Sequence, residues 1–589
     1  MFIHKMFLKE LIRFSTQHRT LYCYLILSFW IFLLIAGMYK YIGNTKIMNG
    51  ITFIHGKRMY LSTINDEETS KFRKYKQRCS PIENIARKDD GGILDGWKLQ
   101  GVLMVIRHGD RGPMSHVRGI SNVNCGIEGD MLVHKYKTFL INSTNPSGTN
   151  HMYWNKIGPF HGFSLLPSLE KSCLLGQLTY KGIAQLLHIG EIIQQVYLRP
   201  LGLYTRSLPS SRQNINSTPN TFLNSDEVIV YSTRYRRTFQ SAMALMFTFL
   251  PPEKWLSLNV LESHSMAFCF LDCTCPQADV LRKKLALKSN ENLQRHAAVS
   301  AVVQWIGKSL LQHPSNTVKT PHEVMDAVLS LICHDAELPC QNNKKNLNKN
   351  RKNLYPTTGP SSNEPNDLIN IDQDEILSSN NYENNFNSLN NGEVNKVNID
   401  IVNDNENNEA NTQFDSCIEQ SHIAALMSYT NWQSSKEVNH KFYKQIGMLR
   451  AYGMIRHIVS FMLRIISGDR TKFVLYSGHD WTMQYLTASL GINTEGVTFI
   501  PYAARLSFEV YNSQTDYYFR AVYNGKDVTQ QIDFCEGGKS LRVTRDSRGN
   551  KADLCPIENI IRFLHEDYFS PLNASNFKDA CTVQKSNEF

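Results

Sequence analysis

The sequence lacks the signatures of several common functional classes. Its net charge is only +10 over 589 residues and is spread along the chain, so nothing indicates a nucleic-acid partner. Metal-binding cysteine patterns are also missing, because Cys273 and Cys275 are too close for a zinc knuckle and no second pair has metal spacing. What the chain does have is length for two or more domains and a hydrophobic content of 42%, which supports a sizeable core.

Charge is absent from residues 20–39, which are almost entirely apolar. Twenty helical residues span roughly 30 Å, the thickness of the hydrocarbon layer. A cleaved signal peptide would have a shorter apolar region and a small-residue cleavage site, and neither is seen. The preceding flank is basic, although Lys40 and Lys46 follow on the other side. We therefore predict a cytoplasmic tail (1–19), a transmembrane signal anchor (20–39) and a lumenal remainder that begins with a stem (40–95).

The cysteines and glycosylation sequons agree with this topology. One cysteine, Cys23, lies in the predicted anchor, which leaves an even number on the lumenal side. An even number in an oxidising compartment indicates disulfides, whose pairing the sequence does not reveal. These cysteines are 79, 125, 173, 269, 273, 275, 333, 340, 417, 535, 555 and 581. Sequons predict glycosylation at Asn142, Asn216 and Asn573.

The most informative stretch begins with a buried strand. Residues 101–106 are apolar and are followed at once by Arg-His-Gly-Asp-Arg-Gly-Pro at 107–113. Arginine offers a planar fork of donors that matches phosphate oxygens, and glycine lets the backbone approach a ligand. A histidine between two arginines is hard to charge, so it should stay neutral and nucleophilic. The pattern suits attack on a phosphate monoester; the alternative is a strand that ends in a solvated basic turn.

Two later stretches repeat the arrangement of a buried strand that leads into ionisable residues. Residues 227–233 form a strand-like run followed by arginines, and a helix that is apolar nearly all round comes next. Residues 472–478 form another such run, which ends in His479 and Asp480. Ligands of open α/β sheets bind beyond the carboxyl ends of the strands, so three such ends predict one shared site.

These stretches resemble the histidine acid phosphatase family. The chain has its R-H-G-x-R-x-P motif at 107–113, a Ser-Thr-x-x-x-Arg-Thr phrase at 232–238 and a His-Asp pair at 479–480. The resemblance implies an α/β fold with a mainly parallel sheet, helices on its faces and an inserted helical cap. Arg234 stands where many members carry an acidic residue, a difference that bears on substrate preference.

The resemblance also implies roles for individual residues. His108 is the expected nucleophile, which forms a phosphohistidine, and Asp480 is the expected proton donor. Neither a metal nor another cofactor is expected, because arginines supply the positive charge. The residues expected to hold the phosphoryl group are Arg107, Arg111, Arg237 and His479.

The remaining sequence completes the predicted domain organisation. Helices are expected from Thr179, as a plausible N-cap, and over roughly 442–467, and a hairpin is expected over 503–525. The asparagine-rich segment 341–413 has few aromatic residues and is interpreted as a disordered insertion. It would interrupt a catalytic domain at 96–570, which a tail (571–589) follows.

Within the family, the chain most resembles a Golgi branch whose members remove phosphate from xylose in the glycosaminoglycan–protein linkage region. We therefore expect a single-pass type II Golgi membrane protein whose partner is a phosphorylated sugar of proteoglycans or another phosphomonoester. A lysosomal-type acid phosphatase and an inositol polyphosphate phosphatase would share the catalytic residues and remain alternatives. A membrane-anchored glycan-binding protein without activity is disfavoured, because every catalytic position is filled.

Overall fold

The computed structural model describes the residues that follow the predicted anchor, with gaps. The ranges are 75–92, 96–144, 158–204, 225–270, 273–312, 320–339, 417–493, 499–546 and 549–583. The predicted anchor, the insertion at 341–413 and the sequon at Asn216 lie outside these ranges. Within them, no helix is both long and apolar enough to cross a membrane.

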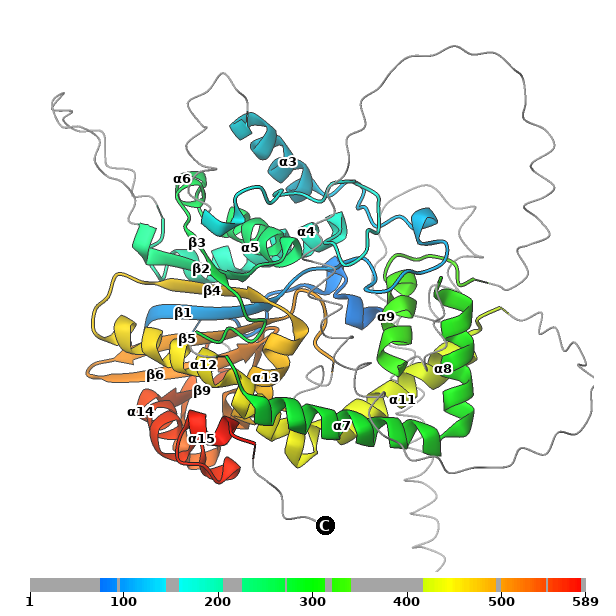
Figure 1. Ribbon diagram of the computed structural model, residues 1–589. Helices are drawn as coiled ribbons and strands as arrows, with labels where there is room; N and C mark the ends of the chain where they lie inside the picture. The colour runs from blue at the N-terminus through cyan, green and yellow to red at the C-terminus, as the bar shows by residue number, and fades with distance from the viewer. Residues whose placement is uncertain are drawn as a thin grey trace, which may run out of the picture. The chain divides into compact units, whose positions relative to one another are not determined.

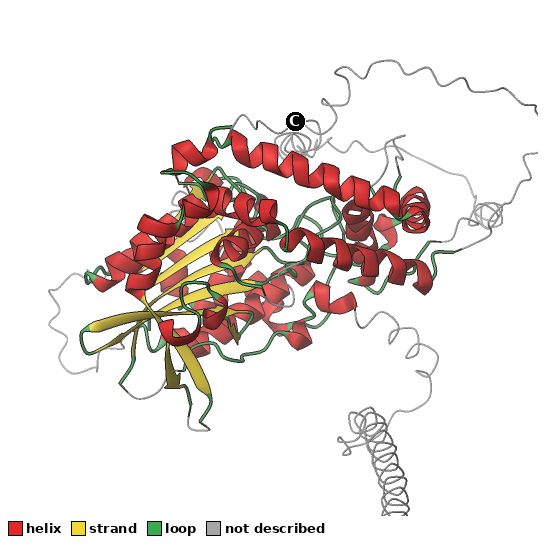
Figure 2. Ribbon diagram, turned by 90° about the horizontal axis from the view of Figure 1, so that it is seen from below, coloured by secondary structure: helices red, strands yellow, loops and turns green. Residues whose placement is uncertain are grey.

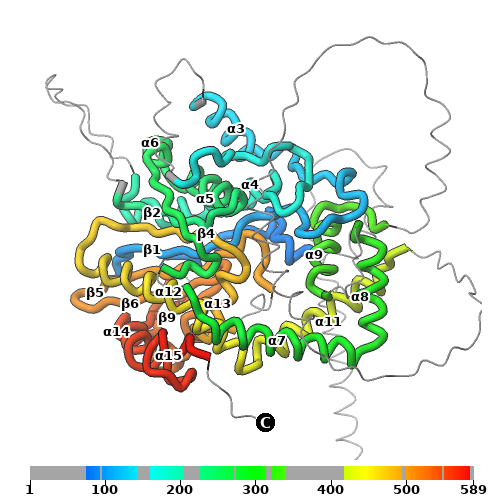
Figure 3. Tube along the Cα trace, viewed as in Figure 1, coloured from blue at the N-terminus to red at the C-terminus, as the bar shows by residue number. Residues whose placement is uncertain are grey.

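One sheet organises the fold, and its strands pair in the order β3-β2-β4-β1-β5-β6-β9-β8, with β7 beside β6. Figure 3 shows that β1, in blue, lies between β4 and β5, which come hundreds of residues later. The strands are β1 Lys98–Arg107, β2 Val228–Thr233, β3 Val260–Ser263, β4 Phe473–Gly478, β5 Arg505–Ser513, β6 Asp516–Tyr523, β7 Lys526–Asp527, β8 Leu541–Thr544 and β9 Lys551–Pro556.

The sheet is mixed, which corrects the expectation of a mainly parallel one. Strands β3, β2, β4 and β1 are parallel, whereas every pairing from β1·β5 onward is antiparallel. The expected hairpin over 503–525 is present as β5 and β6. Because a hairpin joins neighbouring strands without a crossover helix, the chain beyond β4 adds antiparallel strands to one side of a parallel half-sheet.

Helices cover both faces of the sheet (Figures 1 and 2). Side chains along β1 alternate: Leu103 and Val105 pack in the cluster that includes α12 and α13, whereas Met104 and Ile106 pack in the cluster that includes α4 and α5. Burial on both faces explains the continuous apolar run. The helices outside the cap are α3 Met131–Thr144, α4 Tyr180–Ile193, α5 Arg236–Phe249, α6 Pro252–Leu256, α12 Lys441–Ile466, α13 Asp480–Leu490, α14 Ile557–Arg562 and α15 Phe577–Cys581.

Two helices begin and end near the residues that the sequence predicts. Thr179 caps α4, since its side chain accepts a hydrogen bond from the backbone of Gly182. Helix α12 matches the expected 442–467 within a residue, and Gly468 follows it with a φ of 84°, the left-handed conformation that glycine adopts readily.

A helical cap lies between β3 and β4 in the chain. Its helices are α7 Pro276–Arg295, α8 Ala297–Leu310, α9 Pro321–Ile332 and α11 Gln420–Val438. In Figure 1, α8, α9 and α11 group together at one end of the sheet. Helix α9 starts where Thr320 accepts from the Glu323 backbone and Pro321 occupies the first turn. The cap has a hydrophobic cluster of its own, which includes Val303, Val328 and Leu426.

Disulfides join segments that lie far apart in the chain. Cys79 pairs with Cys333 at the end of α9, and Cys275 at the start of α7 pairs with Cys581. Cys79 lies in the predicted stem, and its disulfide to Cys333 makes residues 75–92 part of the folded body. Three further pairs are Cys125–Cys173, Cys269–Cys273 and Cys535–Cys555, and Cys417 is also disulfide-bonded.

Candidate active site

Three parallel strands end side by side at the site. In the register of the sheet, Arg107, the last residue of β1, pairs with Gly478 of β4, and Ser232 of β2 pairs with Ser477 of β4. The backbone N–H of His108 donates to the carbonyl of Gly478, with 3.0 Å between nitrogen and oxygen. The chain therefore leaves each strand at the same edge, as expected for an α/β sheet.

Close packing explains the first glycine of the motif. A Cβ atom added to Gly109 would lie 2.5 Å from the carbonyl oxygen of Gly182 in the first turn of α4. Such an approach is possible only without a side chain. Gly109 therefore lets the loop after β1 rest directly on α4, and this contact fixes the position of His108.

His108 is held in the form that a nucleophile needs. Its Nδ1 lies 2.8 Å from the carbonyl oxygen of Gly109, which can only accept a hydrogen bond. Nδ1 must therefore carry the proton, and the lone pair is on Nε2. Burial lowers the pKa of His108 well below its ordinary value, and the charges of Arg237 and Arg107 add to the effect. The ring stays neutral and nucleophilic.

His479 and Arg237 border the same ring. The ring centroids of His108 and His479 are 5.6 Å apart. His479 caps the start of α13, its Nε2 lies 3.0 Å from Thr233 Oγ1, and burial holds its pKa well below the usual range. Arg237, in the first turn of α5, is buried; it donates to the carbonyl of Gly176 and lies 4.5 Å from the Tyr235 ring centroid.

Asp480 is the most accessible of the charged residues at the site. Its side chain is 33% exposed, and Oδ2 lies 3.3 Å from Nη2 of Arg107. Burial favours its neutral form, but Arg107 and Arg111 outweigh burial and hold the pKa below the usual value. Without substrate, Asp480 is therefore a carboxylate, stabilised by arginines that a phosphate would also engage.

The structure brings all six predicted site residues together: His108, Asp480, Arg107, Arg111, Arg237 and His479. The side chain of Arg234 is exposed, and its Nε lies 3.8 Å from Oε1 of Glu262. Two predicted glycosylation residues, Asn142 and Asn573, are exposed as a glycan requires.

Sequence reasoning missed the residues that hold these arginines. Asp326 of α9 accepts two hydrogen bonds from Arg111, at 3.0 and 3.3 Å, so the cap contributes directly to the site. The guanidinium of Arg107 lies 4.3 Å from the ring centroid of Tyr502 and donates to the carbonyl of Ile500. No motif marks these residues; only the contact between distant segments reveals them.

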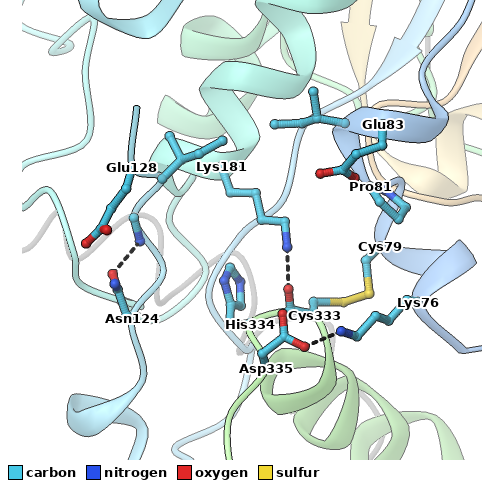
Figure 4. Close-up of a pocket in the computed structure, with 13 residues that line it drawn as sticks. Lys76, Cys79, Pro81, Glu83, Asn124, Glu128, Lys181, Cys333, His334 and Asp335 are labelled. Carbon is cyan, nitrogen blue, oxygen red and sulfur yellow. Dashed lines mark hydrogen bonds and ion pairs between the residues drawn. A yellow bond between two sulfur atoms is a disulfide. The ribbon is translucent and has the colours of Figure 1, made fainter. Parts of the chain in front are cut away.

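A separate pocket of about 400 Å³ lies beside the motif (Figure 4). Its wall includes the Cys79–Cys333 disulfide, and Lys181 donates to the carbonyl of Cys333. His334, which also lines it, places Nε2 2.9 Å from a carboxylate oxygen of the buried Asp110. Asp110 also accepts a hydrogen bond from Thr179. The contacts of Asp110 with Thr179 and His334 therefore help to fix the loop of residues 107–113.

The chain belongs to the histidine phosphatase superfamily (branch 2), which residues 98–524 match. It is accordingly a phosphomonoester hydrolase. Among its relatives is 2-phosphoxylose phosphatase 1 of Xenopus tropicalis, 23% identical over 512 residues, or 85% of this chain and 81% of the relative. The Homo sapiens protein of the same name is 22% identical over 520 residues, or 85% of each chain. A solved phytase from Citrobacter braakii is 15% identical and aligns with 80% of this chain and 98% of its own, with a TM-score of 0.39.

Proposed function

We propose that the protein hydrolyses a phosphomonoester through a phosphohistidine on His108. The supporting observation is the hydrogen bond from Nδ1 to the Gly109 carbonyl, because it directs the Nε2 lone pair away from the backbone. The arginines around the ring both lower its pKa and supply donors for phosphoryl oxygens. One arrangement thus keeps the nucleophile neutral and attracts its anionic target.

In the first step, Nε2 of His108 attacks phosphorus and the bond from phosphorus to the ester oxygen breaks. The leaving oxygen takes a proton from Asp480. The developing charge on the phosphoryl oxygens is stabilised by Arg107, Arg111, Arg237 and His479. One ring nitrogen of His479 accepts from the backbone in the first turn of α13, so Nε2 carries the proton; Nε2 lies 3.0 Å from Thr233 Oγ1 and would have to share this proton with a phosphoryl oxygen.

In the second step, Asp480 accepts a proton from water, which attacks the phosphohistidine and releases inorganic phosphate. Because its pKa is lowered, Asp480 is ionised in the free protein and can accept this proton. The first step needs the protonated acid. A bound phosphate dianion would oppose the field of Arg107 and Arg111, and would thereby raise the pKa of Asp480 when the proton is needed.

The substrate that we propose is the 2-phosphate of xylose in the glycosaminoglycan–protein linkage region. The support is the similarity to the proteins named 2-phosphoxylose phosphatase 1, which align with this chain over most of both sequences. The full-length protein should release phosphate from a phosphoxylosylated linkage oligosaccharide with a kcat/KM at least tenfold above that for inositol hexakisphosphate. Equal or reversed preference would favour the inositol phosphatase alternative.

We also propose that residues 20–39 anchor the catalytic domain in the Golgi membrane with its active site in the lumen. The uncharged run and the exposed sequons at Asn142 and Asn573 support this topology. Glycosidase treatment should lower the apparent mass of the full-length protein, and carbonate extraction should leave it in the membrane. Release of a shortened protein into the medium would argue for a cleaved signal peptide instead.

A further inference from the structure

Arg78 is a charged residue that is surrounded by uncharged side chains where the cap meets the sheet domain. It precedes Cys79, whose disulfide to Cys333 fixes this segment to the end of α9. The guanidinium is part-buried, and its carbon lies 4.5 Å from the ring centroid of Phe499. Its other contacts are the amide oxygen of Asn431 and the thioether sulfurs of Met325, at 2.7 Å, and Met427, at 3.6 Å.

None of these contacts carries a negative charge. Among the residues that the structure describes, Arg78 forms no ion pair with a carboxylate, whereas the buried Arg505 and Arg520 each do. Burial lowers the pKa of Arg78 to about 10, an effect that Tyr75 partly opposes. Removing a charge from water without a counter-charge is unfavourable. A charged side chain at position 78 therefore indicates a role other than packing.

Phe499 connects Arg78 to the catalytic site. The ring of Phe499, against which it lies, is also 5.8 Å from the guanidinium carbon of Arg107. His322, in the first turn of α9, has its pKa lowered by burial, and it lies within the electrostatic range of Glu437, Arg78 and Asp480. Arg78 is therefore connected through Phe499 to Arg107 at the phosphate-binding end.

We propose that Arg78 binds a second anionic group of the substrate, a carboxylate or a further phosphate or sulfate, beside the phosphoryl group held at His108. The proposal rests on the phosphatase function and narrows its substrate class to phosphomonoesters that carry another negative charge nearby. The guanidinium would gain the counter-charge that the protein does not provide. The second group would lie toward the cap, whose Met325 and Met427 contact Arg78.

The binding of phosphonates tests this proposal, because their carbon–phosphorus bond survives the enzyme. Alkylphosphonates would be compared with ω-carboxyalkylphosphonates and alkane bisphosphonates of graded length by titration calorimetry on the full-length protein. The parent should bind the best doubly anionic member about tenfold more tightly than its alkyl counterpart, as expected for a charge-assisted hydrogen bond. The carboxylates and bisphosphonates show which anion Arg78 prefers.

Variants then test whether Arg78 causes the preference for doubly anionic phosphonates. Arg78→Gln should bind both kinds of phosphonate equally, with the affinity for alkylphosphonates unchanged, and Arg78→Lys should retain part of the preference. The matched control is Lys76→Gln, two residues earlier in the same segment. Lys76 is paired with Asp335 in the separate pocket of Figure 4, so its loss should leave the preference intact.

Several outcomes would overturn the proposal. One is a parent protein that binds both kinds of phosphonate equally. Another is an Arg78→Gln variant that loses affinity for both, which would indicate a packing role for Arg78. Turnover of p-nitrophenyl phosphate by the parent is measured in parallel. Its absence would count against the phosphatase function, whereas the binding preference reports on Arg78 alone.

Discussion

The two halves of the sheet bury arginines in opposite ways. In the antiparallel half, Arg520 of β6 is fully buried between Glu509 and Asp527, at 3.1 and 2.8 Å. Glu509 in turn accepts hydrogen bonds from Tyr197 and Tyr511. Each charge there faces an opposite charge and a set of hydrogen bonds, so the cluster is complete in itself.

In the parallel half, the positive charge of the arginines still acts on a neighbouring side chain. Arg107 meets Asp480, which is a third exposed, and Arg111 meets Asp326 at the cap. Together with Arg237 they still depress the pKa of the neighbouring His108. A buried arginine is therefore not by itself a sign of function. An excess of positive charge around a neutral nucleophile is such a sign.

The largest expected effect comes from removing the group at the centre of this excess charge. His108→Ala should lower kcat by roughly 10⁴-fold or more, because uncatalysed hydrolysis of phosphomonoesters is extremely slow. Rapid quenching without acid should trap a phosphohistidine in the parent and none in the variant. Residual activity within tenfold of the parent would contradict covalent catalysis by His108.

The next effect separates two residues in helices that follow different strands, Asp480 at the start of α13 and Arg237 at the start of α5. Asp480→Asn should lower kcat/KM on a sugar phosphate by roughly 10²–10⁴-fold, because its alkoxide leaves badly without a proton. On p-nitrophenyl phosphate, whose leaving group needs little help, the loss should be much smaller. Arg237→Ala should cost a similar factor on both substrates, since Arg237 contacts the phosphoryl group that they share.

Measuring kcat/KM for both variants on both substrates checks this division of roles. Arg237→Lys is the matched control, and it should restore activity only partly because the planar fork of donors is lost. If Asp480→Asn and Arg237→Ala lose activity in the same proportion on both substrates, the two residues do not play the separate roles proposed here.

The smallest effect on catalysis, and the largest on folding, is expected in the antiparallel half. Arg520→Leu leaves Glu509 buried without its counter-charge, which should lower the free energy of unfolding by about 3–5 kcal/mol. Arg237→Leu should cost far less, because Arg237 lies near Arg107 and Arg111 and its charge opposes protonation of His108. Denaturant unfolding and activity per folded molecule check the contrast. Equal destabilisation by both variants would mean that the two halves do not differ in charge balance.

The sequence predicted the parallel half of the molecule well. Site residues of that half lie at or soon after the ends of apolar runs, as His108 follows β1 and His479 follows β4, so the pattern along the chain gives position as well as residue type. The ends of α4 and α12 could be predicted because a capping threonine and a left-handed glycine act locally.

The antiparallel half and the cap could not be predicted in the same way. Alternation predicts the β5–β6 hairpin, but nothing local indicates that β5 pairs with β1, more than 390 residues earlier. Asp326 and Tyr502 reach the site through tertiary contacts, and Asp90 meets Arg505 from a short segment without periodicity. Pairing among twelve cysteines is likewise a property of the folded chain.

The two long-range disulfides bear on how a substrate enters. Cys275 fixes the beginning of α7 to α15, and Cys333 fixes the end of α9 to the segment that carries Arg78. A cap held covalently at both places cannot swing away from the sheet as a hinged lid does. We therefore expect a substrate to reach the site without a large hinge motion of the cap.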